Sequence, residues 1–191
     1  MFEDLKGKFI VVTGASSGIG WYSVEELCAV GAQVTAIGRN EEKLVELSTK
    51  TGCDIISTDL STESGIDVVN NKLCHVDGLV NCAGLALLEP CIDVTGESFD
   101  QHLAINARAT ALMSKIVAQR MIKQGRGGSI VNVSSQASLA SLVDHLSYSA
   151  SKGAMDAMTR VMCAELGPHN IRENSLNPTV TRTPMAKVGG S

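Results

Sequence analysis

Two residues that could move a proton stand one helical turn apart, Tyr148 and Lys152, in the stretch Leu-Ser-Tyr-Ser-Ala-Ser-Lys. Ser135 lies thirteen residues before Tyr148 and closes the run Ile-Val-Asn-Val-Ser-Ser. If the segment around Tyr148 is helical, its phenol and the ammonium of Lys152 share one face. A neighbouring cation favours the phenolate, so it would lower the pKa of Tyr148 from an ordinary value of about 10. The pattern therefore indicates a proton donor for a carbonyl oxygen.

Coincidence is the alternative for this pair, because a Lys four residues after some Tyr arises readily by chance. Three other features occur with it, and their order along the chain is consistent. They are a glycine-rich turn near the N-terminus, the tetrapeptide Asn-Cys-Ala-Gly at 81–84 after a later strand, and the serine at a strand end.

The glycine-rich turn follows an expected strand at 8–13 and precedes a helical pattern from about 20 to 30. Glycines let the backbone turn sharply and approach a pyrophosphate, whose charge then lies at a helix N-terminus. The spacing is Gly-x-x-x-Gly-x-Gly, and a fortuitous triplet among 18 glycines is the alternative. We expect these residues to bind the phosphates of a dinucleotide: Gly14, Ser16, Ser17, Gly18, Ile19 and Gly20.

Arg39 stands where the second expected strand ends, after Gly38. A dinucleotide fold that prefers NAD usually has Asp or Glu there, whereas an Arg suits a 2′-phosphate. Its guanidinium can form paired hydrogen bonds to phosphate oxygens, so the sequence favours NADPH. A solvated loop charge is the alternative interpretation.

Short apolar runs rich in β-branched residues alternate with longer stretches of helical spacing. The runs occur at 8–13, 33–38, 53–57, 77–81, 128–134 and 171–177. Parallel strands need long crossovers and have both faces buried. The fold class predicted is therefore α/β, a doubly wound parallel sheet of the Rossmann type with about six strands, in a single dinucleotide-binding domain over 1–191.

The composition of the chain limits the classes of partner that it can be expected to bind. The 191 residues are 44% hydrophobic, and 16 basic against 20 acidic residues give a net charge of −4 without a basic block, which argues against a nucleic-acid or membrane-surface partner. The apolar run at 9–12 is too short for a signal peptide core or a spanning helix. Six cysteines without zinc or disulfide spacing indicate free thiols in a reducing compartment, so we expect a cytoplasmic protein without a metal site.

Taken together, these motifs resemble the short-chain dehydrogenase/reductase family over essentially the whole chain. The resemblance rests on Thr-Gly-x-x-x-Gly-x-Gly at 13–20, Asn-Cys-Ala-Gly at 81–84, Asn106, Ser135 and Tyr148-x-x-x-Lys152. Ser-Ser-Gln at 134–136, His145, Glu-Leu-Gly-Pro-His at 165–169 and Asn-Pro-Thr-Val at 177–180 are similar to its dicarbonyl/L-xylulose reductase branch. That branch uses NADPH to reduce α-dicarbonyls and sugars.

The resemblance implies a catalytic tetrad. Tyr148 would protonate the carbonyl oxygen while Ser135 holds that oxygen by a hydrogen bond. Lys152 would depress the pKa of Tyr148 and bind the nicotinamide ribose. Asn106 would hold a water that links Lys152 to solvent; a surface helix Asn without a role is the alternative.

The family likeness implies further contacts with NADP(H), to which Tyr148 and Lys152 would also contribute. Asp59 and Leu60, after the third strand, would meet the adenine. The remaining contacts would come from Asn81, Ala83, Gly84, Pro178, Thr179, Val180 and Thr183.

A small-molecule carbonyl substrate would meet Ser135, Gln136 and His145 by the same resemblance. An ordinary loop His is the alternative for His145. His75, His102 and His169 have no recognisable triad or metal constellation, so no role is predicted for them.

Some residues depart from the family pattern. Cys82 stands where a second Asn is more usual, and Ser17 where the branch tends to carry a basic residue. Glu173 interrupts the sixth expected strand, where a buried carboxylate costs several kcal/mol unless it is paired or protonated. The sequence offers no partner for it.

The C-terminus is the largest departure, since the resemblance implies that the substrate-closing loop, a helix and the last strand are missing. Full-length relatives are commonly tetramers, so a homo-oligomer is expected. A truncated, non-catalytic form that binds nucleotide or pairs with full-length subunits is one alternative. A ketoacyl or steroid reductase, with the same tetrad, is another.

Overall fold

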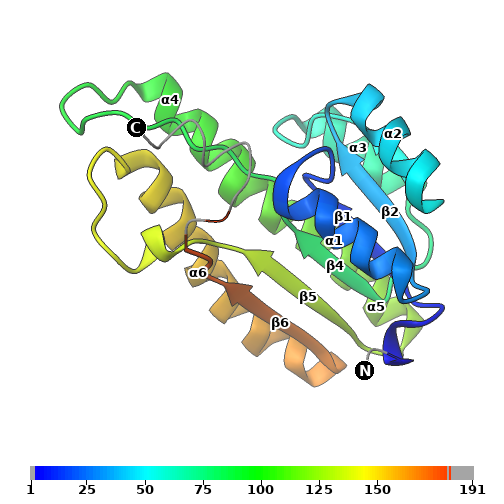
Figure 1. Cartoon of the computed structure of the whole chain (residues 1–191). Coiled ribbons are helices and arrows are strands. Elements are labelled where there is room, and N and C mark those ends of the chain that lie inside the picture. The colour runs from blue at the N-terminus through cyan, green and yellow to red at the C-terminus, as the bar shows by residue number, and fades with distance from the viewer. Residues whose placement is uncertain (1–2, 180, 182–191) are drawn as a thin grey trace.

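Within the described residues, 3–179 and 181, a computed structural model shows six parallel strands in one sheet, ordered β3-β2-β1-β4-β5-β6 (Figure 1). The strands are β1 (Phe9–Thr13), β2 (Gln33–Gly38), β3 (Asp54–Ser57), β4 (Gly78–Asn81), β5 (Gly128–Val133) and β6 (Ile171–Leu176). The chain order of the strands reverses between β1 and β4. In sheets of this kind a ligand crevice lies at such a reversal, outside the carboxyl ends of the strands.

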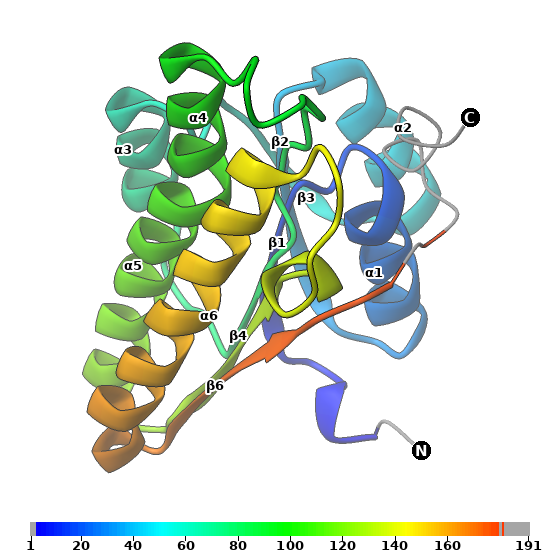
Figure 2. The same cartoon turned by 90° about the vertical axis from the view of Figure 1, so that its left-hand side faces the viewer.

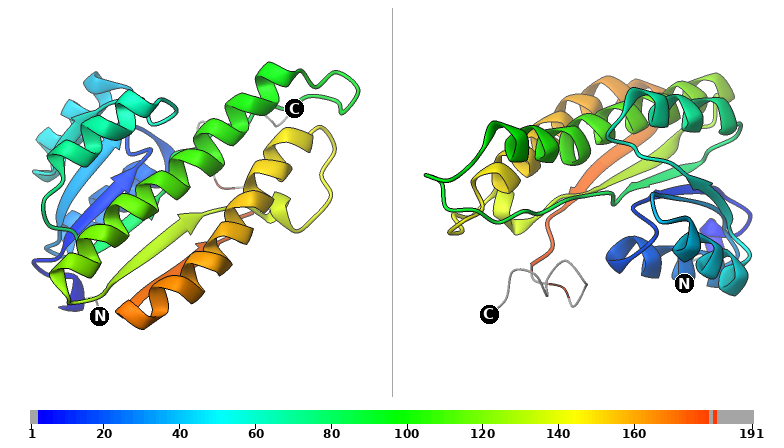
Figure 3. Two further views of the ribbon diagram at one scale, coloured as in Figure 1. Left: turned by 180° about the vertical axis from the view of Figure 1, so that it is seen from behind. Right: turned by 90° about the horizontal axis from the view of Figure 1, so that it is seen from above.

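Helices lie on both faces of the sheet (Figure 2). They are α1 (Gly18–Ala29), α2 (Glu41–Thr51), α3 (Glu63–Lys72), α4 (Gly96–His102), α5 (Ala109–Gln124) and α6 (Leu146–Leu166). A π-helical stretch, Leu103–Arg108, joins α4 to α5 without a break. Figure 3 shows α5 and α6 side by side across one face of the sheet, and the two helices are in contact. None of the helices in the described ranges is long and apolar enough to span a membrane.

The alternation of side chains along β1 builds two hydrophobic layers. Ile10 and Val12 point to the face covered by α1 and α2, where they join Leu44. Val11 points to the opposite face and joins a cluster that includes Met113 of α5. Successive side chains of a strand face opposite sides, so a strand buried on both faces must be a continuous apolar run.

The predicted fold class is confirmed. Each strand begins and ends within one residue of the expected range. Tyr148 and Lys152 both lie on α6, as the four-residue spacing requires for a shared helix face.

Glu173 of β6 is buried, and the structure supplies the partner that the sequence did not reveal. Its side chain is 2% exposed, and its Oε1 accepts a hydrogen bond of 2.8 Å from Asn132 Nδ2. Asn132 Oδ1 in turn accepts from Asn81 Nδ2 at 2.8 Å, so β4, β5 and β6 share one internal polar network. Burial raises the pKa of the Glu173 carboxyl above its usual value, which favours the neutral acid.

Replacement of Glu173 by Gln tests this protonation state. A carboxyl whose pKa is raised by folding contributes stability that is fully present below its unfolded pKa and is lost as the pH rises through its folded pKa. Glu173→Gln keeps the shape and is permanently neutral, so it should raise the melting temperature at pH 8 by a few degrees, on the order of 1 kcal/mol. The gain should shrink toward pH 5.

The control is Glu165→Gln, which changes an exposed glutamate of α6. Thermal unfolding of both variants between pH 5 and pH 8 provides the measurement. An equal effect of Glu173→Gln at both pH values would contradict the interpretation of Glu173 as a neutral acid.

Candidate active site

A cleft of about 430 Å³ opens at the carboxyl ends of the strands, at the reversal between β1 and β4. Ligand pockets in proteins are commonly of this size. The predicted site residues that line it are Gly14, Ser16, Ser17, Gly18, Ile19, Arg39, Leu60, Ala83, Gly84, Ser135, Gln136, His145, Tyr148, Lys152, Pro178 and Thr179. Residues from most parts of the chain therefore meet at this edge of the sheet.

Close packing fixes the glycine turn against the segment after β4. Gly14 has φ +66°, and a Cβ atom on it would lie 2.7 Å from Ala83 Cα. Thr13 Oγ1 accepts hydrogen bonds from the backbone N–H groups of Cys82 (3.0 Å) and Ala83 (3.1 Å). The N-terminus of α1, which begins at Gly18, thus opens into the cleft and can hold an anion.

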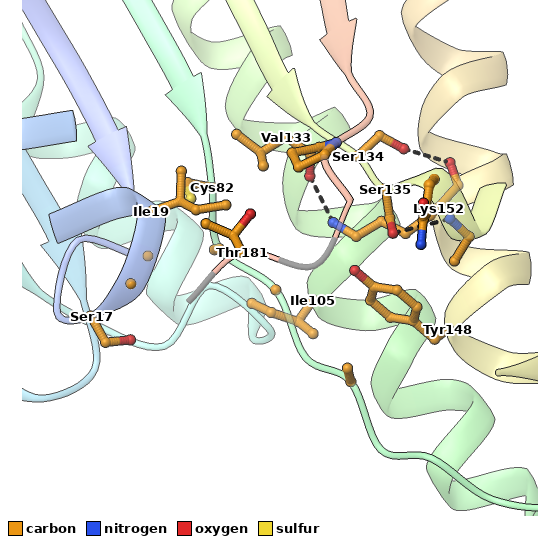
Figure 4. A pocket seen from close by; sticks show the side chains of 18 of the residues that line it. Ser17, Ile19, Cys82, Ile105, Val133, Ser134, Ser135, Tyr148, Lys152 and Thr181 are labelled. Carbon is orange, nitrogen blue, oxygen red and sulfur yellow. Dashed lines mark hydrogen bonds between the residues drawn. The ribbon is translucent and has the colours of Figure 1, made fainter. Parts of the chain in front are cut away.

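Lys152 reaches the cleft from α6 although it is almost fully buried, with 4% of its surface exposed. Its Nζ donates a hydrogen bond of 2.8 Å to the Val133 carbonyl and lies 5.8 Å from the centre of the Tyr148 ring. Burial lowers the pKa of Lys152 to about 8. Figure 4 shows Tyr148, Ser135 and Lys152 at the same end of the cleft.

The pKa of Tyr148 moves in the opposite direction from the sequence prediction. Burial raises it above its usual value, and the Ser135 hydroxyl counters that effect only in part. The expected lowering by Lys152 was wrong, because removal of the phenol from water is the largest influence on its pKa and favours the neutral form. Tyr148 is therefore a protonated phenol at neutral pH.

Asn106 is fully buried in the π-helical stretch, and its side-chain amide forms hydrogen bonds with the backbone of Leu85. Its Oδ1 accepts from Leu85 N–H at 2.8 Å, and its Nδ2 donates to the Leu85 carbonyl at 2.9 Å. Nδ2 also donates to Ser151 Oγ, whose hydroxyl donates to the Tyr148 carbonyl at 2.7 Å. A Cβ atom on Gly84 would lie 3.4 Å from Asn106 Oδ1 and 3.6 Å from Lys152 Nζ, so Gly84 is set between them.

At the far end of the cleft Arg39 faces Asp59, which does not itself line the cleft. Arg39 lines it and is 72% exposed, and its guanidinium lies 4.0 Å from the Asp59 carboxylate. Ser61 holds the Asp59 carboxylate in place, because its backbone N–H and its hydroxyl both donate hydrogen bonds to Asp59 Oδ1. The guanidinium therefore stays available to an anion at this end.

Some predicted residues lie away from the cleft lining. Asn81 is buried behind it and donates to Ser114 and Asn132, so its side chain holds the sheet together. Gly20 packs under the turn, where a Cβ atom would lie 2.4 Å from the Gly14 carbonyl oxygen. Val180 and Thr183 lie outside the described residues.

His145 and Tyr148 stand side by side in the cleft, with ring centres 6.1 Å apart. Sequence reasoning did not find several other lining residues, which include Cys82, Ala86, Leu88, Ile105 and Leu142. Burial raises the pKa of the Cys82 thiol to about 11, so the group remains a neutral thiol. The apolar residues carry no motif, and only the folded chain brings them to the cleft.

His102, for which the sequence predicted no role, lies outside the cleft lining. It stands four residues before Asn106, which places the two side chains on one helix face.

In the described residues, no group of three or more His, Cys, Asp or Glu side chains is arranged to hold a metal ion.

Comparisons with known proteins identify the family of the chain. The family model described as short chain dehydrogenase matches residues 8–190. L-xylulose reductase of Mus musculus is 44% identical over 188 residues, which are 98% of this chain and 77% of that protein. Carbonyl reductase [NADPH] 2 of Sus scrofa is 42% identical over the same shares.

Two solved structures are also similar to this chain. A short chain dehydrogenase/reductase family protein has a TM-score of 0.93 at 31% identity, over 97% of this chain and 79% of that one. The 3-ketoacyl-(acyl-carrier-protein) reductase from Brucella melitensis, complexed with NADH, has a TM-score of 0.91 at 28% identity, over 96% of this chain and 80% of that one.

Substitution of Gly14 by Ala tests the glycine turn as a nucleotide site. Because φ is positive and the new Cβ would clash with Ala83, the turn must shift, and binding of NADPH and NADH should weaken at least tenfold. Gly52→Ala is the matched control, since Gly52 has φ +75° and nothing within 4 Å of the new Cβ.

The control should lower stability by about 1 kcal/mol and leave nucleotide binding unchanged. Nucleotide fluorescence titration and thermal unfolding measure both effects. Unaltered nucleotide affinity in a folded Gly14→Ala protein would rule out the turn as the phosphate site.

Proposed function

Because the chain belongs to the short-chain dehydrogenase/reductase family of oxidoreductases, we propose that it is an NADPH-dependent carbonyl reductase acting on α-dicarbonyls and sugars such as L-xylulose. One observation carries the proposal. A protonated Tyr148 and a buried Lys152 share the cleft into which the glycine turn opens.

In the proposed reaction the Tyr148 phenol donates its proton to the carbonyl oxygen of the substrate. Ser135, which lines the cleft with Tyr148, positions the same oxygen. The Lys152 ammonium stabilises the phenolate that remains, because charges in a water-excluded cleft interact strongly. A bound nicotinamide nucleotide supplies the hydride.

The raised pKa of Tyr148 keeps the phenol in the protonated form that carbonyl reduction requires. An acid must hold its proton at working pH in order to deliver it, and burial keeps the phenol protonated. Lys152 attracts negative charge to the phenol oxygen only when that charge develops, which stabilises the transition state more than the ground state.

Arg39 supports the choice of NADPH. The guanidinium is exposed at the end of β2, where a 2′-phosphate can be met by two parallel hydrogen bonds. Ser16, which packs against Gly38 beside it, adds a hydroxyl. The relative named Carbonyl reductase [NADPH] 2 points to the same cofactor.

The substrate end of the cleft supports a small carbonyl compound with a second polar group. Gln136 and His145 line it together with apolar side chains such as Ala137 and Leu142. A neighbouring carbonyl or hydroxyl can bond to the two polar residues while the apolar ones exclude water. The names of the relatives, L-xylulose reductase and D-erythrulose reductase, support a compound of this kind.

Removal of the phenol hydroxyl tests the role of Tyr148. Oxidation of NADPH with diacetyl or L-xylulose, followed by its absorbance, should be rapid for the wild type. Tyr148→Phe should lower kcat by about 10²–10⁴-fold and bind NADPH nearly unchanged. Tyr22→Phe is the control, because Tyr22 is 62% exposed and is the only other tyrosine. Full activity in Tyr148→Phe would overturn the proposed mechanism.

The lowered pKa of Lys152 predicts a pH dependence. An amine with a pKa of about 8 is charged below that pH and neutral above it. Since kcat/KM reports groups of the free enzyme, kcat/KM for carbonyl reduction should fall as the pH rises through about 8. A profile that stays flat up to pH 10 would show that the charge of Lys152 is not needed.

A further inference from the structure

A stripe of buried polar side chains runs along one side of the long helix from α4 to α5. Its members recur at every fourth residue, and each is at most 6% exposed: Ser98, His102, Asn106, Thr110 and Ser114. A four-residue repeat drifts around an α-helix, whose turn holds 3.6 residues. The wider π-helical turn over Leu103–Arg108 offsets part of this drift and keeps the stripe on one side.

The N-terminal half of this stripe holds the segment 85–89, here called the wall segment. Asn106 bonds both the N–H and the carbonyl of Leu85, and His102 Nε2 accepts from Leu87 N–H at 3.0 Å. Ser98 Oγ donates to Glu89 Oε2 at 2.6 Å. Alternate residues of the wall segment are thus bonded to the helix.

The two intervening residues, Ala86 and Leu88, face the cleft. They line it together with Leu142 and His145, whose loop meets the wall segment through the bond from Glu89 N–H to the Asp144 carbonyl. The helix bonds therefore set how far Ala86 and Leu88 project toward Tyr148.

His102 is held as one neutral tautomer. Its Nδ1 lies 2.7 Å from the Ser98 carbonyl oxygen, which can only accept, so Nδ1 carries the proton. Nε2 is then bare and accepts from Leu87. The ring is fully buried and lies edge to face with Tyr148, at 6.3 Å between centres.

Resting on the proposed function, we propose that His102 is a positioning residue for the carbonyl substrate. It acts through the Leu87 backbone to fix Ala86 and Leu88 against the substrate beside Tyr148. Leu87 itself is 39% exposed, so packing of its side chain does not hold the middle of the wall segment. The bond to His102 does.

Two substitutions separate this role from a general loss of stability. His102→Gln retains an acceptor oxygen that can reach Leu87, whereas His102→Leu fills the space without one. We expect His102→Leu to raise KM for diacetyl at least tenfold, with the Kd for NADPH within twofold of the wild type. His102→Gln should bring KM back to within about threefold. Hydrogen exchange at the Leu87 amide should be faster in His102→Leu than in His102→Gln.

Thr110→Val is the matched control, because Thr110 belongs to the same buried stripe but donates to the Asn106 carbonyl within the helix. It should lower the melting temperature and leave KM unchanged. If His102→Leu does not fold, His102→Asn replaces it, since its shorter amide cannot reach Leu87.

An unchanged KM in His102→Leu, or equal KM values in the Leu and Gln variants, would overturn the role of His102 while leaving the proposed reductase intact. An increase in the Kd for NADPH as large as that in KM would overturn it as well. Lack of carbonyl turnover by the wild type would instead reject the proposed function, and the substrate role of His102 with it.

Discussion

The backbone that follows β4 is held from two sides, and the groups at the cleft take their positions from it. On one side Thr13 Oγ1 accepts from Cys82 and Ala83, and Gly14 packs against the same peptides with no room for a side chain. On the other side Asn106 bonds the Leu85 backbone and, through Ser151, the helix turn that carries Tyr148. One strand end thus links the glycine turn to the proposed proton donor.

Burial in the cleft then determines the protonation states of Lys152 and Tyr148. Lys152 is removed from water and has a pKa of about 8, so it is positive at neutral pH but close to losing its proton. Burial has the opposite effect on the acid Tyr148, whose pKa rises and which keeps its proton. A cleft that holds a protonated phenol beside an ammonium suits carbonyl reduction, in which negative charge appears on the phenol as the proton leaves.

Local patterns in the sequence were enough to predict the sheet, the glycine turn and the placing of Tyr148 and Lys152 on one helix, because strand runs and helical spacing are local. The pKa direction of Tyr148 was not predictable, since it depends on how much water the folded cleft excludes. Glu173 lacked a visible partner because Asn132 and Ser114 reach it only after β5 and α5 have packed. His102 was missed because its partner is a backbone N–H group, which has no sequence signature.

The protonation state of Tyr148 is the most direct test, and a chain with only two tyrosines allows a clean measurement. With ¹³C at the ring Cζ of tyrosine, a pH titration by NMR gives two signals, and the one lost in Tyr148→Phe belongs to the cleft. The account predicts that in the ligand-free protein this signal keeps the shift of a protonated phenol through neutral pH and titrates above about 10. A transition near pH 7 would show a phenolate in the resting site and would contradict the account.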